Sequence, residues 1–208
     1  MGTTEYADEP SFAEEPVAGL TKARLDDCAE ALFSNPRSKA YLYLTEERGI
    51  KPKILKACGI GWDAKKKAYL ISVRDRRKRL VNVKYWWPEW SPNVKRKGRK
   101  EMLFAVSVAR GGEWLHLFPT YDLAKPARIL ICEGEVDCMT LLSNGYAAVT
   151  SFGGAGKWDP AWGPLFTGKD VIIIPDLDPE GRKHVEVVRE SVAPHASSLR
   201  VLNWGDVL

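Results

Sequence analysis

The sequence lacks the features that mark membrane and secreted proteins. None of its 208 residues belongs to a run of about 18 apolar residues, the length needed to span a membrane. There is no N-terminal apolar segment of the kind found in secretory signals. Four cysteines are too few for a disulfide-stabilised scaffold in a chain of this length. We therefore expect no membrane partner and no export.

The cysteines and histidines also lack the spacing of a zinc site. No two of the four cysteines form a Cys-x-x-Cys pair, and the three histidines do not follow them at the spacing of zinc ligands. We therefore expect no zinc in this chain, and thiols that are reduced and mostly buried. Reduced thiols and the missing export signal together predict a cytoplasmic protein.

The composition is that of a folded, globular chain. Hydrophobic residues make up 45% and charged residues 28% of the sequence, which excludes an intrinsically disordered protein. A length of 208 residues is enough for one ordinary domain or two small ones.

The net charge of +4 conceals an uneven distribution. Residues 64–100 contain 14 Lys and Arg against 2 Asp and Glu, whereas residues 1–34 contain 2 basic and 8 acidic residues. A segment this basic attracts a polyanion, and nucleic acid is the commonest one. Aromatic rings between the charges can stack unpaired bases. The alternative is an ordinary charged face with a few core tryptophans. The rings in question are Tyr85, Trp86, Trp87 and Trp90.

The first part of the chain predicts a mixed α+β subdomain. Residues 1–18 are acidic and without periodicity, which indicates a flexible arm. Apolar spacing predicts helices first and antiparallel strands afterwards, so we expect an N-terminal basic subdomain over residues 19–126. The helices are expected at 19–34, 37–47 and 52–58, and the strands at 68–74, 80–86, 102–106 and 114–118, with a basic loop over 88–100.

The last part of the chain predicts a parallel sheet. Its expected strands are apolar without alternation and are separated by helices, as in sheets covered on both faces. We therefore predict an α/β protein with a Rossmann-like parallel-sheet domain over residues 127–208. The expected strands are 129–132, 147–149, 171–175 and 199–202, with helices at 136–144 and 179–192 and a Gly-rich loop at 151–158.

Carboxylates follow two of these predicted strands directly. Glu133 comes after strand 129–132, and Asp176 and Asp178 come after strand 171–175. Open α/β sheets bind ligands at the carboxyl ends of their strands, so we expect these side chains to converge there. Oxygen ligands without Cys or His suit Mg²⁺ or Mn²⁺. The alternative is that Asp178 only caps the following helix and Glu133 is only a polar strand end.

Three segments of this region resemble the TOPRIM domain. Residues 131–137 resemble the acidic-glycine motif that opens the domain, and residues 174–182 resemble its Asp-x-Asp motif. Residues 151–158 resemble the loop of phage and plasmid primases of this family. The resemblance implies a metal-dependent catalytic site. Its catalytic and metal-binding carboxylates would be Glu133, Asp176 and Asp178, with Asp137 as a supporting metal ligand.

The upstream half resembles the DnaG-type DNA primase catalytic core, in its phage- and plasmid-like form. Residues 69–83 are similar to its basic hairpin and residues 41–60 to its helical start. The resemblance covers roughly residues 37–206. It implies a DNA-directed RNA polymerase of the primase type, a nucleotidyltransferase that makes short RNA primers on single-stranded DNA during replication. The implied setting is a bacterial or phage-infected cell, with ribonucleoside triphosphates as substrates, Mg²⁺ or Mn²⁺ as cofactor and a replicative helicase as a candidate partner.

The same resemblance implies which residues hold template, hybrid or triphosphate. They come from the basic hairpin, the basic loop and the Gly-rich loop, and for Lys157 a surface lysine at a turn is the alternative. The implied residues are Arg74, Arg76, Arg77, Arg79, Lys84, Lys95, Arg96, Lys97, Arg99, Lys100, Gly153, Gly154 and Lys157.

The chain departs from the primase pattern at two points. It lacks the zinc-ribbon spacing with which such enzymes select a template, and it ends where the family continues into further helices. We expect either a piece of a larger primase or primase-helicase, or a reduced stand-alone version. Two other functions use the same residues: a metal-dependent TOPRIM nuclease, and a non-catalytic module that binds single-stranded nucleic acid.

Overall fold

The computed structural model describes residues 21–74, 80–93, 100–102, 117–119, 123–152 and 157–203. The chain divides into two compact units, residues 1–116 and residues 117–208. Each unit is built around its own sheet, so the mixed α/β class predicted from the sequence is confirmed. Among the described residues, no helix is both long and apolar enough to cross a membrane.

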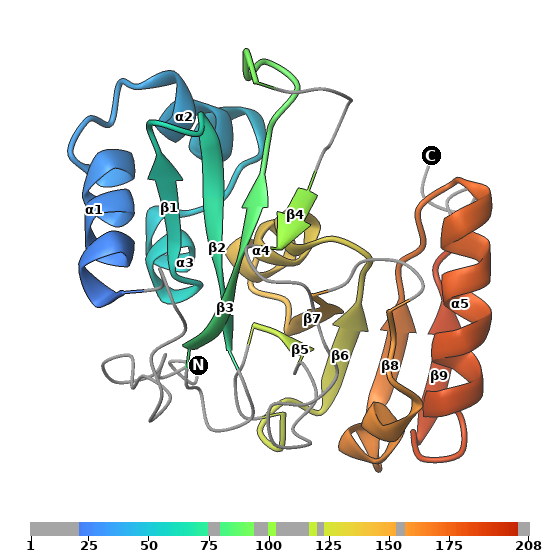
Figure 1. Cartoon of the computed structure of the whole chain (residues 1–208). Coiled ribbons are helices and arrows are strands. Elements are labelled where there is room, and N and C mark those ends of the chain that lie inside the picture. The colour runs from blue at the N-terminus through green and yellow to red at the C-terminus, as the bar shows by residue number, and fades with distance from the viewer. Residues whose placement is uncertain are drawn as a thin grey trace. The chain divides into compact units, whose positions relative to one another are not determined.

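The N-terminal unit places short helices before an antiparallel sheet (Figure 1). Its strands are paired in the order β1-β2-β3-β4. Strands β2 and β3 have the bounds that the alternating pattern predicted. The elements are α1 (Lys22–Phe33), α2 (Lys39–Leu42), the π-helical turn η1 (Tyr43–Glu47), α3 (Pro52–Ala57), β1 (Ile60–Asp63), β2 (Ala68–Arg74), β3 (Leu80–Trp86) and β4 (Lys100–Met102).

Strand β1 is an element that the sequence pattern did not predict. Two glycines, Gly59 and Gly61, indicated the end of a helix there. Gly61 instead lies within the strand, where α1 packs directly on it. A Cβ built on Gly61 would lie 2.7 Å from Cβ of Cys28 on α1, so a larger residue would separate the helix from the sheet. Glycine inside a strand often marks such a close approach.

The second unit is a mostly parallel sheet in the order β5-β7-β6-β8-β9. Strands β6 to β9 are parallel to their neighbours, and β5 is antiparallel to β7. The elements are β5 (Leu117–Phe118), β6 (Arg128–Ile131), α4 (Glu135–Ser143), β7 (Ala148–Ser151), the 3₁₀ helix η2 (Pro160–Phe166), β8 (Asp170–Ile173), α5 (Pro179–Val192) and β9 (Ser198–Val201).

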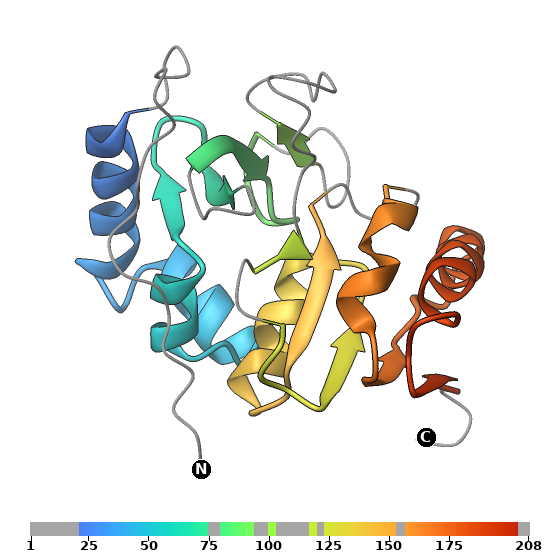
Figure 2. The same cartoon turned by 90° about the horizontal axis from the view of Figure 1, so that it is seen from below.

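The central strands β6 and β7 are covered on both faces, as their lack of alternation predicted. Strand β8 instead alternates between buried and half-buried residues, and β9, at the edge of the sheet, is mostly exposed. Figure 2 shows α4 on one face of the sheet and η2 and α5 on the other. One face of β6 and β8 packs against η2 and α5 in a continuous core. Its members include Ile129, Ile131, Val171, Ile173, Trp162, Phe166, Val185, Val188 and Val192.

The sequence pattern predicted two strands, 102–106 and 114–118, before the domain boundary. Residues 103–116 lie outside the described part of the chain, but Leu117 and Phe118 form β5 and pair with Ser151 and Thr150 of β7. These two residues therefore belong to the second unit, although the sequence analysis assigned them to the N-terminal subdomain.

Candidate active site

Strands β6 and β8 are adjacent and parallel, but the connections that follow them run toward opposite sides of the sheet. After β6 it passes through α4 to β7 on one side, and after β8 it passes through α5 to β9 on the other. Such a reversal is the topological switch point at which open α/β sheets bind their ligands. Glu133 follows β6 and Asp176 follows β8, so the topology brings both to this point.

A hydrogen bond joins the two strand ends. The backbone N–H of Asp176 donates to Oε1 of Glu133 across 2.9 Å. The Glu133 residue is 7% exposed, whereas Asp176 is exposed. Within the described part of the chain, Oε2 of Glu133 accepts no hydrogen bond. The bond thus fixes the position of this carboxylate and leaves one oxygen for a ligand.

Asp178 caps helix α5, which is the alternative role that the sequence left open for it. Its Oδ1 accepts a hydrogen bond of 2.7 Å from the backbone N–H of Gly181, and Pro179 occupies the first turn. This arrangement satisfies an N–H group that the helix leaves without a partner. The cap uses one carboxylate oxygen, and the residue itself is exposed, so capping does not exclude a second role for Asp178.

Gly181 explains why a glycine follows the Asp-x-Asp motif. A Cβ at this position would lie 2.4 Å from the Asp176 carbonyl oxygen and 2.6 Å from Oε1 of Glu133. Both distances are far below van der Waals contact. The first turn of α5 therefore packs against both strand-end loops, and only a residue without a side chain fits there.

The electrostatic environment of Glu133 is unfavourable for its charge. Burial is the main cause that raises the pKa of its carboxyl group, and the nearby carboxylates of Asp176, Asp178 and Asp137 raise it further. The Asp176 amide acts in the opposite direction by stabilising the ionised form. A buried carboxylate beside three others is a site whose repulsion a cation would relieve.

The donor set fits a hard cation, although its ligands are not gathered into a closed site. No three His, Cys, Asp or Glu side chains among the described residues lie close enough together to hold a metal ion. The groups at the switch point are nevertheless carboxylates, the ligands that Mg²⁺ and Mn²⁺ prefer. Asp137 is half-buried on the first turn of α4, next to the wholly buried Glu135, which the sequence analysis left out of the site.

The basic residues predicted to bind nucleic acid differ in exposure. Lys157 is exposed and Arg74, at the end of β2, is half-buried. Lys84 departs from the expectation of an exposed cation, since it lies opposite Ile71 in the sheet and is 4% exposed. Lys100 is the first residue of β4. The other predicted positions lie outside the described residues: Arg76, Arg77, Arg79, Lys95, Arg96, Lys97, Arg99, Gly153 and Gly154.

Three of the four aromatic rings that were expected to stack bases are core residues. Tyr85, Trp86 and Trp87 are 2%, 7% and 6% exposed, so the expectation that they stack bases is wrong. Tyr85 and Trp86 end strand β3, in which successive side chains point to opposite faces of the sheet. Both faces are covered here, so both rings are buried. Trp90 lies in the following loop and is half-buried.

Solved structures of primases share this arrangement of elements. The primase fragment of the bacteriophage T7 primase-helicase protein matches at a TM-score of 0.57 with 21% identity, over 76% of this chain and 62% of that one. A DNA primase domain from Pseudomonas aeruginosa matches at 0.61 with 18% identity, over 86% and 68%. The Aquifex aeolicus primase, with zinc-binding and RNA polymerase domains, matches at 0.59 with 21% identity, over 82% and 51%.

This chain has the fold of DnaG-type primase catalytic cores. The resemblance found in the sequence is thereby confirmed for the fold. The chain spans about half to two thirds of the length of the primase structures it matches. No protein-family model and no characterised protein matches it by sequence.

Proposed function

We propose that this chain is the catalytic core of a DNA primase, which makes short RNA primers on single-stranded DNA by metal-dependent nucleotidyl transfer. The observation that carries the proposal is the Glu133–Asp176 hydrogen bond, which joins two carboxylate-bearing loops at the switch point of a primase-type fold. A carboxylate cluster at this position suits the binding of triphosphates through a divalent ion.

In this proposal Glu133, Asp176 and Asp178 hold Mg²⁺ or Mn²⁺, with Asp137 in support, as in a TOPRIM domain. When bound, the ion would neutralise triphosphate charge and lower the pKa of the primer 3′-hydroxyl. The chain's own contribution is to fix the ligands. The Asp176 amide holds Glu133, and the Gly181 amide holds Asp178, which limits the rearrangement needed to gather the carboxylates around an ion.

The proposed substrates are a single-stranded DNA template and ribonucleoside triphosphates. Support comes from the exposed Lys157 and the half-buried Arg74, and from a DnaG primase catalytic domain of this fold that was solved bound to single-stranded DNA. A replicative helicase is a candidate partner, because the matched T7 fragment comes from a primase-helicase protein.

Primer synthesis on a single-stranded template tests the proposal. With Mg²⁺ and labelled ribonucleotides, the chain should make oligoribonucleotides, and Asp176→Ala should reduce the rate on the order of 100-fold or more. Glu186→Ala, which removes an exposed carboxylate of α5, is the matched control and should have normal activity.

The same assay separates the other functions. A shortened template without RNA product would identify a nuclease that uses the same carboxylates. DNA binding without either product, unchanged by Asp176→Ala, would identify a non-catalytic binding module and overturn the proposal.

A further inference from the structure

A cluster of five aromatic side chains extends from the core of the N-terminal unit to its surface. At its centre is Tyr69, wholly buried, whose ring is stacked on Trp86 with centroids 5.0 Å apart. Trp62 meets Tyr69 edge-on, also at 5.0 Å, and is stacked on Trp90 at 5.4 Å with an interplanar angle of 27°. Trp62, Trp90 and the fifth ring, Tyr43, are half-buried. The outer part of the cluster therefore reaches solvent.

The loop that carries Trp90 is tied to the turn between β1 and β2. Trp87 Nε1 and Asn93 Nδ2 donate to the carbonyl oxygen of Lys66 at 3.0 and 2.9 Å, and Ser91 Oγ donates to that of Lys67 at 2.6 Å. These bonds engage the backbone of the turn and hold the loop from both sides of Trp90. The ring is thus presented on a fixed support.

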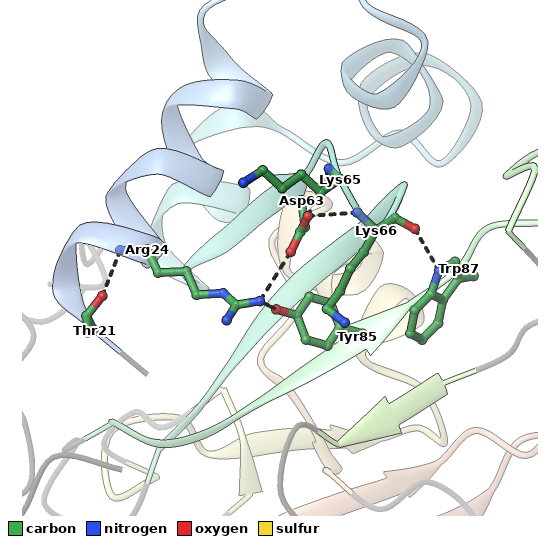
Figure 3. Close-up of polar contacts among 7 residues, drawn as sticks. All are labelled: Thr21, Arg24, Asp63, Lys65, Lys66, Tyr85 and Trp87. Atoms are coloured by element: carbon green, nitrogen blue, oxygen red, sulfur yellow. Dashed lines mark hydrogen bonds and ion pairs between the residues drawn. The ribbon is translucent and has the colours of Figure 1, made fainter. Parts of the chain in front are cut away.

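The turn itself is held by a polar network (Figure 3). Asp63 Oδ1 accepts hydrogen bonds from the amides of Lys65 and Lys66 at 3.0 and 2.9 Å. Arg24 reaches from α1 to Asp63 Oδ2 at 3.4 Å and to the Tyr85 hydroxyl at 2.6 Å. The backbone of the turn, to which the Trp90 loop is bonded, is therefore itself fixed. The ammonium group of Lys66 lies over the Tyr85 ring, at 4.9 Å from its centre.

A lysine lies directly against the tryptophan pair, and two more are exposed on the neighbouring turn. Nζ of the exposed Lys39 lies 4.9 Å from the centre of the Trp90 ring. Lys65 and Lys67 are exposed on the turn to which the Trp90 loop is bonded. Two carboxylates are also nearby: Glu89 in the loop, and Glu47, whose charge acts on Tyr69. An apolar partner would leave these lysine charges uncompensated, whereas a chain of phosphates with flat bases would match both the charges and the rings.

We propose that the Trp62–Trp90 pair is a stacking platform for an unpaired base of single-stranded nucleic acid. A base stacked on an aromatic ring contributes more binding energy than an exposed ammonium group does, so the base displaces Lys39 from Trp90. The released Lys39 then pairs with a neighbouring phosphate. This site extends the proposed function, on which it rests for the identity of the strand as template.

Oligonucleotides with and without bases test the platform, since both have the same phosphate charge. Fluorescence anisotropy would compare a 12-residue oligothymidine with an abasic strand of equal length. We expect the protein to bind the oligothymidine about tenfold more tightly, and Trp90→Leu to remove most of that preference. Trp90→Phe, which keeps a ring, should retain it, and Lys39→Ala should weaken binding of both strands.

Tyr146→Ala is the matched control, because Tyr146 is an exposed aromatic residue of the second unit, 54% exposed. A thermal melt of each variant would identify loss of folding, in which case Trp90→Phe and Lys39→Ala decide the matter. A Trp90→Leu variant that folds and keeps the full preference would overturn the platform. Trp90-dependent base preference without primer synthesis would instead overturn the proposed function and leave the platform standing.

Discussion

The Asp176 amide donates a hydrogen bond of 2.9 Å to Oε1 of Glu133, so the loop after β8 holds the carboxylate that follows β6. The two residues are 43 positions apart in the sequence. They meet because β6 and β8 are parallel neighbours with Ile131 opposite Ile173. The position of the proposed metal ligand thus depends on the register of the sheet as well as on its own side chain.

Gly181→Ala should disrupt this arrangement, although alanine ordinarily favours a helix more than glycine does. Its Cβ would lie 2.4 Å from the Asp176 carbonyl oxygen, which forces the loop away from Glu133. We expect primer synthesis to fall on the order of 100-fold, with a loss of about 1–3 kcal/mol in the free energy of unfolding. Urea denaturation and the priming assay measure both. Val187→Ala, on an exposed part of α5, is the control, and normal activity in Gly181→Ala would contradict the role given to this contact.

Glu133→Gln should stabilise the protein while abolishing its activity. Burial and three neighbouring carboxylates raise the pKa of Glu133, so ionising it costs native-state stability as pH rises from the ordinary value of 4.5 through the raised one. Glutamine removes this cost at neutral pH and keeps an oxygen for the Asp176 amide. We expect Tm without metal to rise by roughly 2–4 °C.

Mg²⁺ should raise the Tm of the unmodified protein but not that of Glu133→Gln, because the amide is a poorer ligand. Differential scanning calorimetry at pH 7 with and without the ion makes the comparison. An equal shift in both proteins would show that Glu133 does not bind the metal.

His184 should make the second unit sensitive to mild acid. The residue is 1% exposed, packs edge-on against Trp158 at 6.2 Å, and has no hydrogen-bond partner among the described residues at either ring nitrogen. Burial lowers the pKa of its imidazole from 6.5. The imidazole therefore binds a proton more readily in the unfolded protein than in the folded one. As a result, the free energy of unfolding decreases as pH falls below about 6.5.

His184→Leu should flatten this dependence, which for one proton has a slope of at most about 1.4 kcal/mol per pH unit. Urea unfolding between pH 5 and pH 8 measures the slope. Lys183→Ala, an exposed neighbour on α5, should keep it. An unchanged slope in His184→Leu would assign the acid sensitivity to other groups.

Asp170→Ala should lower stability without lowering catalysis. Asp170 begins β8 and accepts hydrogen bonds from Arg128, Arg200 and Ser198, which join β6, β8 and β9 at the end of the sheet opposite to the carboxylates. These donors lower the pKa of Asp170 to about 2. The stability that Asp170 contributes is therefore present above the ordinary carboxyl pKa of 3.8 and is lost as pH falls toward 2.

Thermal melts at pH 7 and pH 2.5 measure this contribution. The difference in Tm between Asp170→Ala and the unmodified protein should shrink at the lower pH, and the priming rate at 25 °C should be unchanged. A variant with normal Tm at pH 7 would mean that the three donors pair equally well with water.

Local patterns in the sequence determined most of the elements. Alternation predicted β2 and β3 with their observed bounds, and Asp178 with Pro179 predicted the start of α5. The unbroken apolar strands predicted a covered parallel sheet, and with it the convergence of Glu133 and Asp176. These signals are short-range or depend on a general rule of sheet topology, so they can be read without coordinates.

Tertiary structure decided the features that depend on contacts between distant segments. Local sequence did not indicate that Gly61 would lie in a strand under α1, because the reason is the closeness of Cys28. Nor did it distinguish the buried Trp86 from the half-buried Trp90, which is stacked on Trp62 far earlier in the chain. A residue's type limits the chemistry it can perform. Its burial and neighbours, which packing alone sets, decide whether it performs that chemistry.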